Sequence, residues 1–401
     1  MHRLRLSLVT VIALPLMLIF APLAAHGQDA SPAAGALPDG VTIVASGLIN
    51  PRGFIWDGDG RFYVALGGNG GMSTNPESAA PAEEPPAADA TPDLVADSAE
   101  VLVADNSGAV VEIVDGCPVD FSMGFPSYNF LPLNWADGVI DVTLLDGEMY
   151  ALIDGGGEAV LHPDEPNGVY RIGADGEAEL VADLSAWFRA NPVANATRDI
   201  SPDAQPYALV PGDGALWVSE SNHEQILTVT PDGTITRFID LSTDDEFGIT
   251  VPTGVAPAPN GGIYVGFLTE LPFPDGTARV IEIAPDGAVT EAWTGLTAVT
   301  DIAVSPDGTL YAVELATGNT DTEPFYHPNT GKIVRQTGPD SLEEIATGLD
   351  FPVHISFGPD GGLYVSGPAF GANGGEGTIV RIDPAAAPVD LSALSQAQLD
   401  C

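Results

Sequence analysis

Short apolar segments recur along the chain, and turns rich in aspartate, asparagine and glycine join them in pairs. Each copy is an apolar strand, a Pro-Asp-Gly turn or a relative of it, and an apolar-aromatic strand. Asp-Gly and Asn-Gly supply the positive φ of tight hairpins, so every copy predicts two antiparallel strands. The six copies occupy residues 53–66, 141–153, 207–220, 254–267, 301–314 and 354–367.

A second hairpin follows most of these copies and brings the unit to four strands. These hairpins lie at residues 169–184, 226–241, 280–296 and 332–349. Six four-stranded antiparallel units predict an all-β fold, a six-bladed β-propeller, because closing the ring protects the strand edges. The sixth unit has no fourth strand after residues 377–383, whereas residues 41–48 form a strand without a partner. We therefore expect the N-terminal strand to complete the last blade.

Insertions enlarge the early blades of this predicted propeller, which spans residues 41–383. Residues 72–99 are rich in Ala, Pro, Glu and Asp, a composition that buries too little apolar surface to order itself. We interpret them as a low-complexity acidic loop between the second and third strands of the first blade, with a functional lid as the alternative. A second insertion, residues 183–206, contains a short helix-like segment around Trp187 and Arg189. We expect this insertion to be ordered.

The two ends of the chain lie outside the predicted propeller. Basic residues precede an apolar run from Leu6 to Phe20, and small residues follow it, as in a secretory signal peptide spanning residues 1–27. A transmembrane anchor is the alternative, but Pro15 interrupts the run, which is shorter than the roughly 20 residues of a spanning helix. We expect a protein that does not span the membrane and is secreted or periplasmic, with a flexible segment at 28–40 and a C-terminal tail at 384–401.

Charge narrows the range of partners. The chain has 12 basic and 56 acidic residues and a net charge of −44. A surface this acidic repels nucleic acid and anionic membranes, so neither is expected as a partner, and we expect a monomer. The acidity has two explanations: the first is solubility or a saline habitat, and the second is cation binding. Without a carboxylate cluster of defined geometry the first is favoured.

The two cysteines, Cys117 and Cys401, suit one disulfide in an exported chain. Such a bridge would pin the C-terminal tail to the body of the propeller. The alternative is two unpaired thiols, with Cys401 linking two molecules.

Several stretches resemble the ScyD/ScyE-like secreted β-propellers, relatives of the NHL-repeat superfamily. They are GLINPRGF, GFPSYNF, VYRIGADGEAELVADLSAW, QPYALVPGDGALWVSESNHEQI and the long run from Val251 to Glu314, in which LPFPDG is the most specific motif. The resemblance covers most of residues 41–383, and the acidic stretch at 72–99 departs from it. It implies the propeller fold and no particular activity.

Candidate site residues follow from the same repeats. Sites in propellers usually lie at one mouth of the central channel, where the first strands of the blades begin. Alignment on the turns places six residues at equivalent positions there: Gly53, Asp141, Tyr207, Gly254, Asp301 and His354. Asp141, Asp301 and His354 could hold Ca²⁺ or another divalent cation, or position a water. Arg52 could bind a carboxylate or neutralise the two aspartates. The favoured alternative is that these polar groups satisfy one another in a wet channel.

Three functions remain open: a binding or scaffold module, a cation-dependent enzyme, and a purely structural role in a cell envelope. The sequence contains no Gly-x-Ser-x-Gly elbow, phosphate loop or dinucleotide fingerprint, which removes support from serine hydrolase, nucleotide and redox-cofactor chemistry. The first hypothesis is an extracytoplasmic binding or scaffold module for a small molecule, glycan or protein. The alternative is a cation-dependent enzyme of the lactonase or lyase kind at the channel mouth. Glu220 and Glu314, at the ends of second strands, are predicted to cap turns and tie blades together, with a metal or acid/base role as the alternative.

Overall fold

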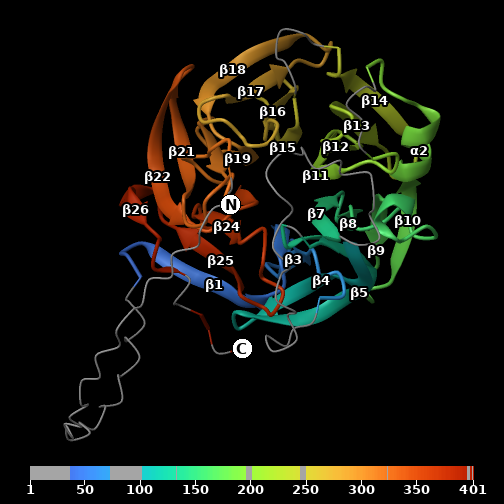
Figure 1. The fold of residues 1–401 in the computed structure, drawn as a ribbon, viewed down its shortest axis with the longest axis horizontal. Helices are drawn as coiled ribbons and strands as arrows, with labels where there is room; N and C mark the ends of the chain where they lie inside the picture. The colour runs from blue at the N-terminus through green and yellow to red at the C-terminus, as the bar shows by residue number, and fades with distance from the viewer. Residues whose placement is uncertain are drawn as a thin grey trace, which may run out of the picture. The chain divides into compact units, whose positions relative to one another are not determined.

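Six sheets build the fold in the computed structural model of this chain (Figure 1). The structure describes residues 37–72, 102–131, 133–195, 201–243, 250–322, 324–394, 398–399 and 401. The predicted signal peptide and nearly all of the acidic stretch at 72–99 lie outside the described residues. Residues 36–401 form one compact unit.

Each sheet is one blade, numbered here from the N-terminal side. Blade 1 contains β2 (Pro51–Trp56), β3 (Phe62–Leu66), β4 (Leu102–Val114), β5 (Cys117–Phe130) and β6 (Trp135–Asp137). Blade 2 contains β7 (Val139–Leu145), β8 (Glu148–Ile153), β9 (Gly168–Ile172) and β10 (Ala178–Asp183). Blade 3 contains β11 (Pro206–Pro211), β12 (Leu216–Glu220), β13 (Gln225–Val229) and β14 (Ile235–Asp240). Blade 4 contains β15 (Pro252–Pro257), β16 (Ile263–Phe267), β17 (Ala278–Ile283) and β18 (Val289–Leu296).

The last two blades include both ends of the described chain. Blade 5 contains β19 (Val299–Val304), β20 (Leu310–Glu314), β21 (Gly331–Gly338), β22 (Ser341–Leu349) and the short β26 (Val389–Asp390), which runs parallel to β22. Blade 6 contains β23 (Ile355–Phe357), β24 (Leu363–Gly367), β25 (Gly377–Ile382) and β1 (Val41–Leu48). The six-bladed β-propeller predicted from the repeats is thus confirmed.

The N-terminal strand closes the ring. β1 pairs antiparallel with β25, beginning at Val41 opposite Ile382, and supplies the outermost strand of blade 6. Figure 1 shows this blue strand beside the red strands of the C-terminal blade. The expectation for residues 41–48 is therefore confirmed, and every blade obtains at least four strands.

Among the described residues, apolar side chains from adjacent blades pack into six clusters, one between each pair of neighbours, and a seventh cluster lies in the loops around Leu268. Leu152 of blade 2 and Leu216 of blade 3 are fully buried in one of them, and Trp293 is fully buried between blades 4 and 5. Burying a leucine side chain stabilises a fold by about 2 kcal/mol. The short apolar strands of the repeats therefore build a ring of interfaces between blades.

The turns differ in one detail from the prediction. Among the Asp-Gly and Asn-Gly turns of the six repeats, only Asp146-Gly147 has positive φ at both residues. In the others the glycine alone adopts it, as Gly308 does at φ 87°. The aspartate there acts through its side chain, since Asp307 Oδ1 accepts the backbone N–H of Thr309 at 3.2 Å. Such Asx geometry is the second way in which aspartate favours turns.

Blade 1 has an outer hairpin that the repeat pattern did not include. Its strands β4 and β5 are 13 and 14 residues long and meet at Asp115-Gly116, both with positive φ. This Asp-Gly turn was the sequence signal that could have revealed the hairpin. The helix expected in the second insertion is present as α2 (Leu184–Ala190), whose N-terminus is capped by the Asp183 side chain accepting from Ala186 N at 2.7 Å.

The C-terminal tail runs along the outer strands of three blades. It adds β26 to blade 5 and then reaches β1 in blade 6, where Leu399 N donates to Ser46 Oγ at 3.0 Å. It ends in a disulfide between Cys401 and Cys117 of blade 1, with a Cα–Cα distance of 5.5 Å. The disulfide therefore connects the tail that contacts β1, the strand that closes the ring, to β5 of blade 1.

Candidate functional site

The inner strands β2, β7, β11, β15, β19 and β23 surround the central channel. One residue in or directly before each inner strand lies in the same layer of the channel, because the residue that follows it pairs with the same position of the second strand in every blade. These six residues are Gly53, Asp141, Ala208, Gly254, Asp301 and His354. Five of them are the predicted ones. Tyr207 lies one residue before this layer, at the same level as Arg52. Alignment on the turns misplaced it because the segment from the layer residue to the turn aspartate is one residue shorter in blade 3 than in blade 6.

Asp141 and Asp301 fasten neighbouring blades in the same manner. Asp141 Oδ1 accepts the N–H of Val142 at 2.8 Å, and its Oδ2 accepts the N–H of Leu209 in blade 3 at 2.7 Å. Asp301 repeats the pattern three blades later, with its Oδ2 accepting the N–H of Ile355 in blade 6 at 3.0 Å. Buried N–H groups that lack a ladder partner need such acceptors. Both carboxylates therefore have a structural role.

Glycines make room for these two carboxylates. A Cβ on Gly53 would lie 1.9 Å from Asp141 Oδ1, and a Cβ on Gly254 would lie 2.5 Å from Asp301 Oδ1. Going from blade to blade, the layer residues therefore follow the same order twice. A glycine, an aspartate and a third residue occur in blades 1, 2 and 3, and the same order recurs in blades 4, 5 and 6. The third residue is Ala208 in one half and His354 in the other.

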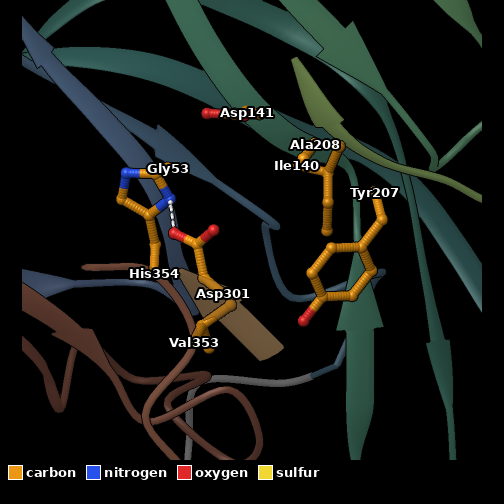
Figure 2. A pocket seen from close by; sticks show the side chains of 8 residues that line it. All are labelled: Gly53, Ile140, Asp141, Tyr207, Ala208, Asp301, Val353 and His354. Carbon is orange, nitrogen blue, oxygen red and sulfur yellow. Dashed lines mark ion pairs between the residues drawn. The ribbon is translucent and has the colours of Figure 1, made fainter. Parts of the chain in front are cut away.

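His354 forms an ion pair with Asp301 in blades 5 and 6, whereas the alanine at the equivalent position of blade 3 has no charge to offer Asp141. His354 Nδ1 lies 2.8 Å from Asp301 Oδ2 (Figure 2). Its ring also contacts Phe54 edge-on, with centroids 4.7 Å apart. Burial opposes the charged imidazole, but the Asp301 carboxylate outweighs it and raises the pKa of His354 above its usual value. In Figure 2 the Tyr207 hydroxyl points away from Asp141. The predicted site residues therefore surround one part of the channel without converging on one point.

This part of the channel, the waist, is narrow. Gly53, Asp141, Tyr207, Asp301 and His354 line a cavity of about 10 Å³ there, which is room for about one water. Across the described ranges, no three His, Cys, Asp or Glu side chains are arranged to hold a metal ion. The geometry of the described residues therefore does not support the cation site expected from Asp141, Asp301 and His354, and the aspartate oxygens accept backbone N–H groups instead.

Arg52 faces a different group from the one expected. Its guanidinium forms an ion pair with Asp137 at 2.8 Å and donates to the carbonyl of Ala136. Both charged side chains are 2% exposed. Arg52 therefore pairs with Asp137 and not with Asp141 or Asp301, the two aspartates that it was expected to neutralise.

The Arg52–Asp137 pair lines a larger cavity of about 80 Å³ beside the waist, here named the mouth cavity. Ile140 and Tyr207 line both cavities and so lie between them. The apolar residues that line the mouth cavity are Leu133, Trp135, Ile140, Val251, Leu268, Leu271, Phe273, Leu315, Tyr326, Ala369 and Phe370. Most come from the loops that follow the second strands, which meet where the first strands begin.

The polar lining of the mouth cavity includes Asp154, Gln205 and Tyr207 beside the Arg52–Asp137 pair. Asp154 is 5% exposed. Burial, followed by the nearby Asp137 and Glu220 carboxylates, raises the pKa of Asp154 well above its usual range. Burial also raises the pKa of the Tyr207 phenol. At neutral pH these surroundings therefore favour the neutral forms of both groups.

Sequence reasoning missed Asp137 and Asp154, although a signal for one was present. Asp154 directly follows the second strand of blade 2, as Ser221, Leu268 and Leu315 follow those of blades 3, 4 and 5. All four line the mouth cavity. Alignment of the residue after each second strand would have found it.

Glu220, in contrast, lies one position earlier and behaves as the predicted cap. Its carboxylate accepts the N–H groups of Gln205 and His223, each at 2.9 Å. Glu314 accepts the N–H of Thr297 at 2.8 Å. Both are buried, so each ties a loop to the end of its second strand.

Replacing Asp301 with Asn is expected to lower the free energy of unfolding by about 2 kcal/mol, because an amide oxygen cannot accept in place of both carboxylate oxygens. Chemical denaturation measures the change. Asp286→Asn, at an exposed turn, is the control and should have little effect. Because the role assigned to Asp301 is structural, the loss should be equal in calcium and in chelator. A loss seen only in calcium would show instead that a cation is bound there.

Stability is expected to fall as pH rises from 5 to 8. Burial raises the pKa of Asp141 to about 6 and that of Glu314 to about 7. A carboxyl whose folded pKa exceeds its unfolded value stabilises the fold at low pH, and this is lost as pH passes the folded pKa. We expect a loss of about 2 kcal/mol, measured by denaturation at each pH. Glu314→Gln should flatten the curve above pH 6, and a parallel curve in that variant would contradict the assignment.

None of the described helices is long and apolar enough to cross a membrane. No family model matches the chain, and no curated protein matches it.

Solved structures resemble the fold of this chain. A putative oxidoreductase (glucose dehydrogenase) from Thermus thermophilus shares 15% identity over 85% of this chain and 99% of its own, with a TM-score of 0.50. A protein of unknown function from Bacteroides thetaiotaomicron shares 11% identity over 85% and 74%, with a TM-score of 0.51. Virginiamycin B lyase from Staphylococcus aureus shares 15% identity over 85% and 98%, with a TM-score of 0.45. Identities this low show a common fold alone.

Proposed function

We propose that this protein is an extracytoplasmic binding module, of the ScyD/ScyE-like group that its motifs resemble, and that it holds a small molecule in the mouth cavity. The carrying observation is the lining of that cavity, in which apolar and aromatic side chains surround a few buried polar groups. This is the usual composition of small-molecule sites, where apolar walls supply affinity and polar groups fix orientation. Ligands of propellers also commonly enter where the first strands begin.

Export of the protein is part of the proposal. The signal peptide predicted at residues 1–27 supports it, and the Cys117–Cys401 disulfide suits an oxidising compartment. The expected mature chain begins after Gly27. The N-terminal sequence of the exported protein tests this, and an intact N-terminus retained in the cytoplasm would contradict it.

The cation-dependent lactonase or lyase alternative receives no support from the waist, where the aspartate oxygens hold backbone N–H groups. The mouth cavity supplies the better binding surface, because it is larger and most of its walls are apolar. We therefore retain the binding-module function and do not argue an enzymatic one.

Replacing Leu271 with Ala is expected to weaken ligand binding at least threefold. Leu271 lines the mouth cavity yet is 52% exposed, so its loss removes ligand contact without creating a cavity in the core. A library of small fragments, screened by protein-observed NMR, supplies the ligands. Leu180→Ala, with a side chain 41% exposed on β10, is the matched control and should leave both affinity and melting unchanged.

Fragments that bind at the mouth cavity, with affinities reduced by Leu271→Ala alone, would support the proposal. Fragments that bind elsewhere, or equal affinities in the two leucine variants, would contradict it.

A further inference from the structure

The charged groups of the mouth cavity do not all neutralise one another. Arg52 and Asp137 form an ion pair, and the second oxygen of Asp137 accepts the Tyr128 hydroxyl at 3.2 Å. Asp154 also lines the cavity, but no described Arg, Lys or His forms an ion pair with it. Within the described chain its carboxylate accepts one side-chain hydrogen bond, from Asn167 Nδ2 to Oδ1 at 3.3 Å. A buried carboxylate without a cationic partner is costly to ionise.

The surroundings of Asp154 favour an incoming positive charge over a negative one. Beside burial, the negative charges of Asp137 and Glu220 raise the pKa of Asp154, whereas the positive charge of Arg52 lowers it. Arg52 already pairs with Asp137, and Glu220 accepts backbone N–H groups and lies 3.0 Å from His223 Nδ1. Among the described residues, Asp154 is therefore the carboxyl group of the cavity that lacks a cationic partner. An anionic ligand would face these carboxylates, whereas a cation would let Asp154 ionise at a smaller cost.

Aromatic walls add a second reason for a cation. The ring centroids of Trp135 and Phe370 lie 5.3 Å apart, and those of Tyr326 and Phe370 lie 5.9 Å apart. All three side chains line the mouth cavity. Aromatic faces attract ammonium groups and also accept the alkyl body of a ligand. The net charge of −44 further concentrates cations near the protein.

We propose that the ligand of the mouth cavity is an organic cation, a protonated amine with a short apolar body, whose charge is matched by Asp154. This inference rests on the proposed function, because it requires that the mouth cavity bind a small molecule. It adds the chemical class of the ligand.

Three probes of nearly equal size and different charge test the inference: butylamine, butan-1-ol and butanoate. Their binding is measured by protein-observed NMR at one pH and one ionic strength, with melting temperature recorded for every variant. Butylamine should bind at least tenfold more tightly than butan-1-ol, and butanoate should bind most weakly. In Asp154→Asn, which keeps the shape of the side chain, butylamine affinity should fall to that of the alcohol, whose own affinity should not change. Asp286→Asn is the matched control.

Equal binding of butylamine and butan-1-ol, tighter binding of butanoate, or unchanged butylamine affinity in folded Asp154→Asn would each overturn the inference. If Asp154→Asn fails to fold, the three probes on the unmodified protein still decide the charge preference. Failure of all three probes while other fragments bind at the mouth cavity would overturn the cation inference alone. If no fragment binds there, the proposed function fails with it.

Discussion

Breaking the Cys117–Cys401 disulfide is expected to lower the free energy of unfolding by about 4 kcal/mol, the largest single effect predicted for this fold. The bridge joins residues separated by 284 positions, and a crosslink that closes so long a loop removes much conformational freedom from the unfolded chain. It also holds the tail across β1, the strand that closes the ring. Denaturant unfolding with and without a reducing agent measures the change.

The double variant Cys117→Ser, Cys401→Ser is the control for the reducing agent. It should unfold at the lower denaturant concentration in both conditions, because no disulfide remains to be reduced. Equal stability of the oxidised and reduced protein would show that the bridge does not stabilise the propeller.

Replacing Gly53 with Ala is expected to lower the free energy of unfolding by about 3 kcal/mol. The new Cβ would lie 1.9 Å from Asp141 Oδ1 and 3.0 Å from the Cα of Asp141, so both a side chain and the backbone of blade 2 must move. Overpacking in a buried site costs about 1 to 3 kcal/mol, and loss of the Asp141 contact with Leu209 N adds to it. Denaturant unfolding again provides the measurement.

Gly58→Ala is the matched control for Gly53→Ala. A Cβ at Gly58 meets nothing within 4 Å, so this variant should be as stable as the parent protein or slightly more stable. If the two alanine variants unfold alike, the close packing of Gly53 against Asp141 does not govern the stability of this interface.

The fold could be predicted from the sequence because its information is local. Each hairpin is specified by a turn and two short strands, and six copies at intervals define the blades before any long-range contact is considered. Closure of the ring could also be predicted, because the last unit lacks a fourth strand and residues 41–48 form a strand without a partner. The hairpin β4–β5 was not identified because an insertion separates it from the first hairpin of blade 1, unlike the second hairpins of blades 3 and 4. The Asp115-Gly116 turn was the signal for it.

The candidate site could be predicted only in part, because it depends on register and on loops. Alignment on the turns identified Asp141, Asp301 and His354 as channel residues, but a shift of one residue in blade 3 put Tyr207 in the wrong layer. The alignment also suggested Asp141 and Asp301 as cation ligands. In the structure these carboxylates accept the N–H groups of Leu209 and Ile355. Which oxygen remains free for a ligand depends on contacts between blades that no repeat pattern contains.

The lining of the mouth cavity was predicted only in part, at Arg52 and Tyr207, for a related reason. Most of the lining comes from loops that differ from blade to blade, such as the one that carries Asp154. Trp135 and Asp137 come from β6, a fifth strand that the four-stranded repeat does not include. All of these residues come together only when the ring closes and the loops meet at one end of the channel. The repeats therefore predict the scaffold well, and the individual loops determine what the scaffold binds.

A crystal structure of the protein soaked with butylamine is the most direct test of the claim that the mouth cavity is the binding site. The account predicts density for the amine in the mouth cavity, with its nitrogen within hydrogen-bond distance of the Asp154 carboxylate and its carbons against the aromatic wall. Density at the waist beside Asp301 and His354, or on the outer surface alone, would contradict it.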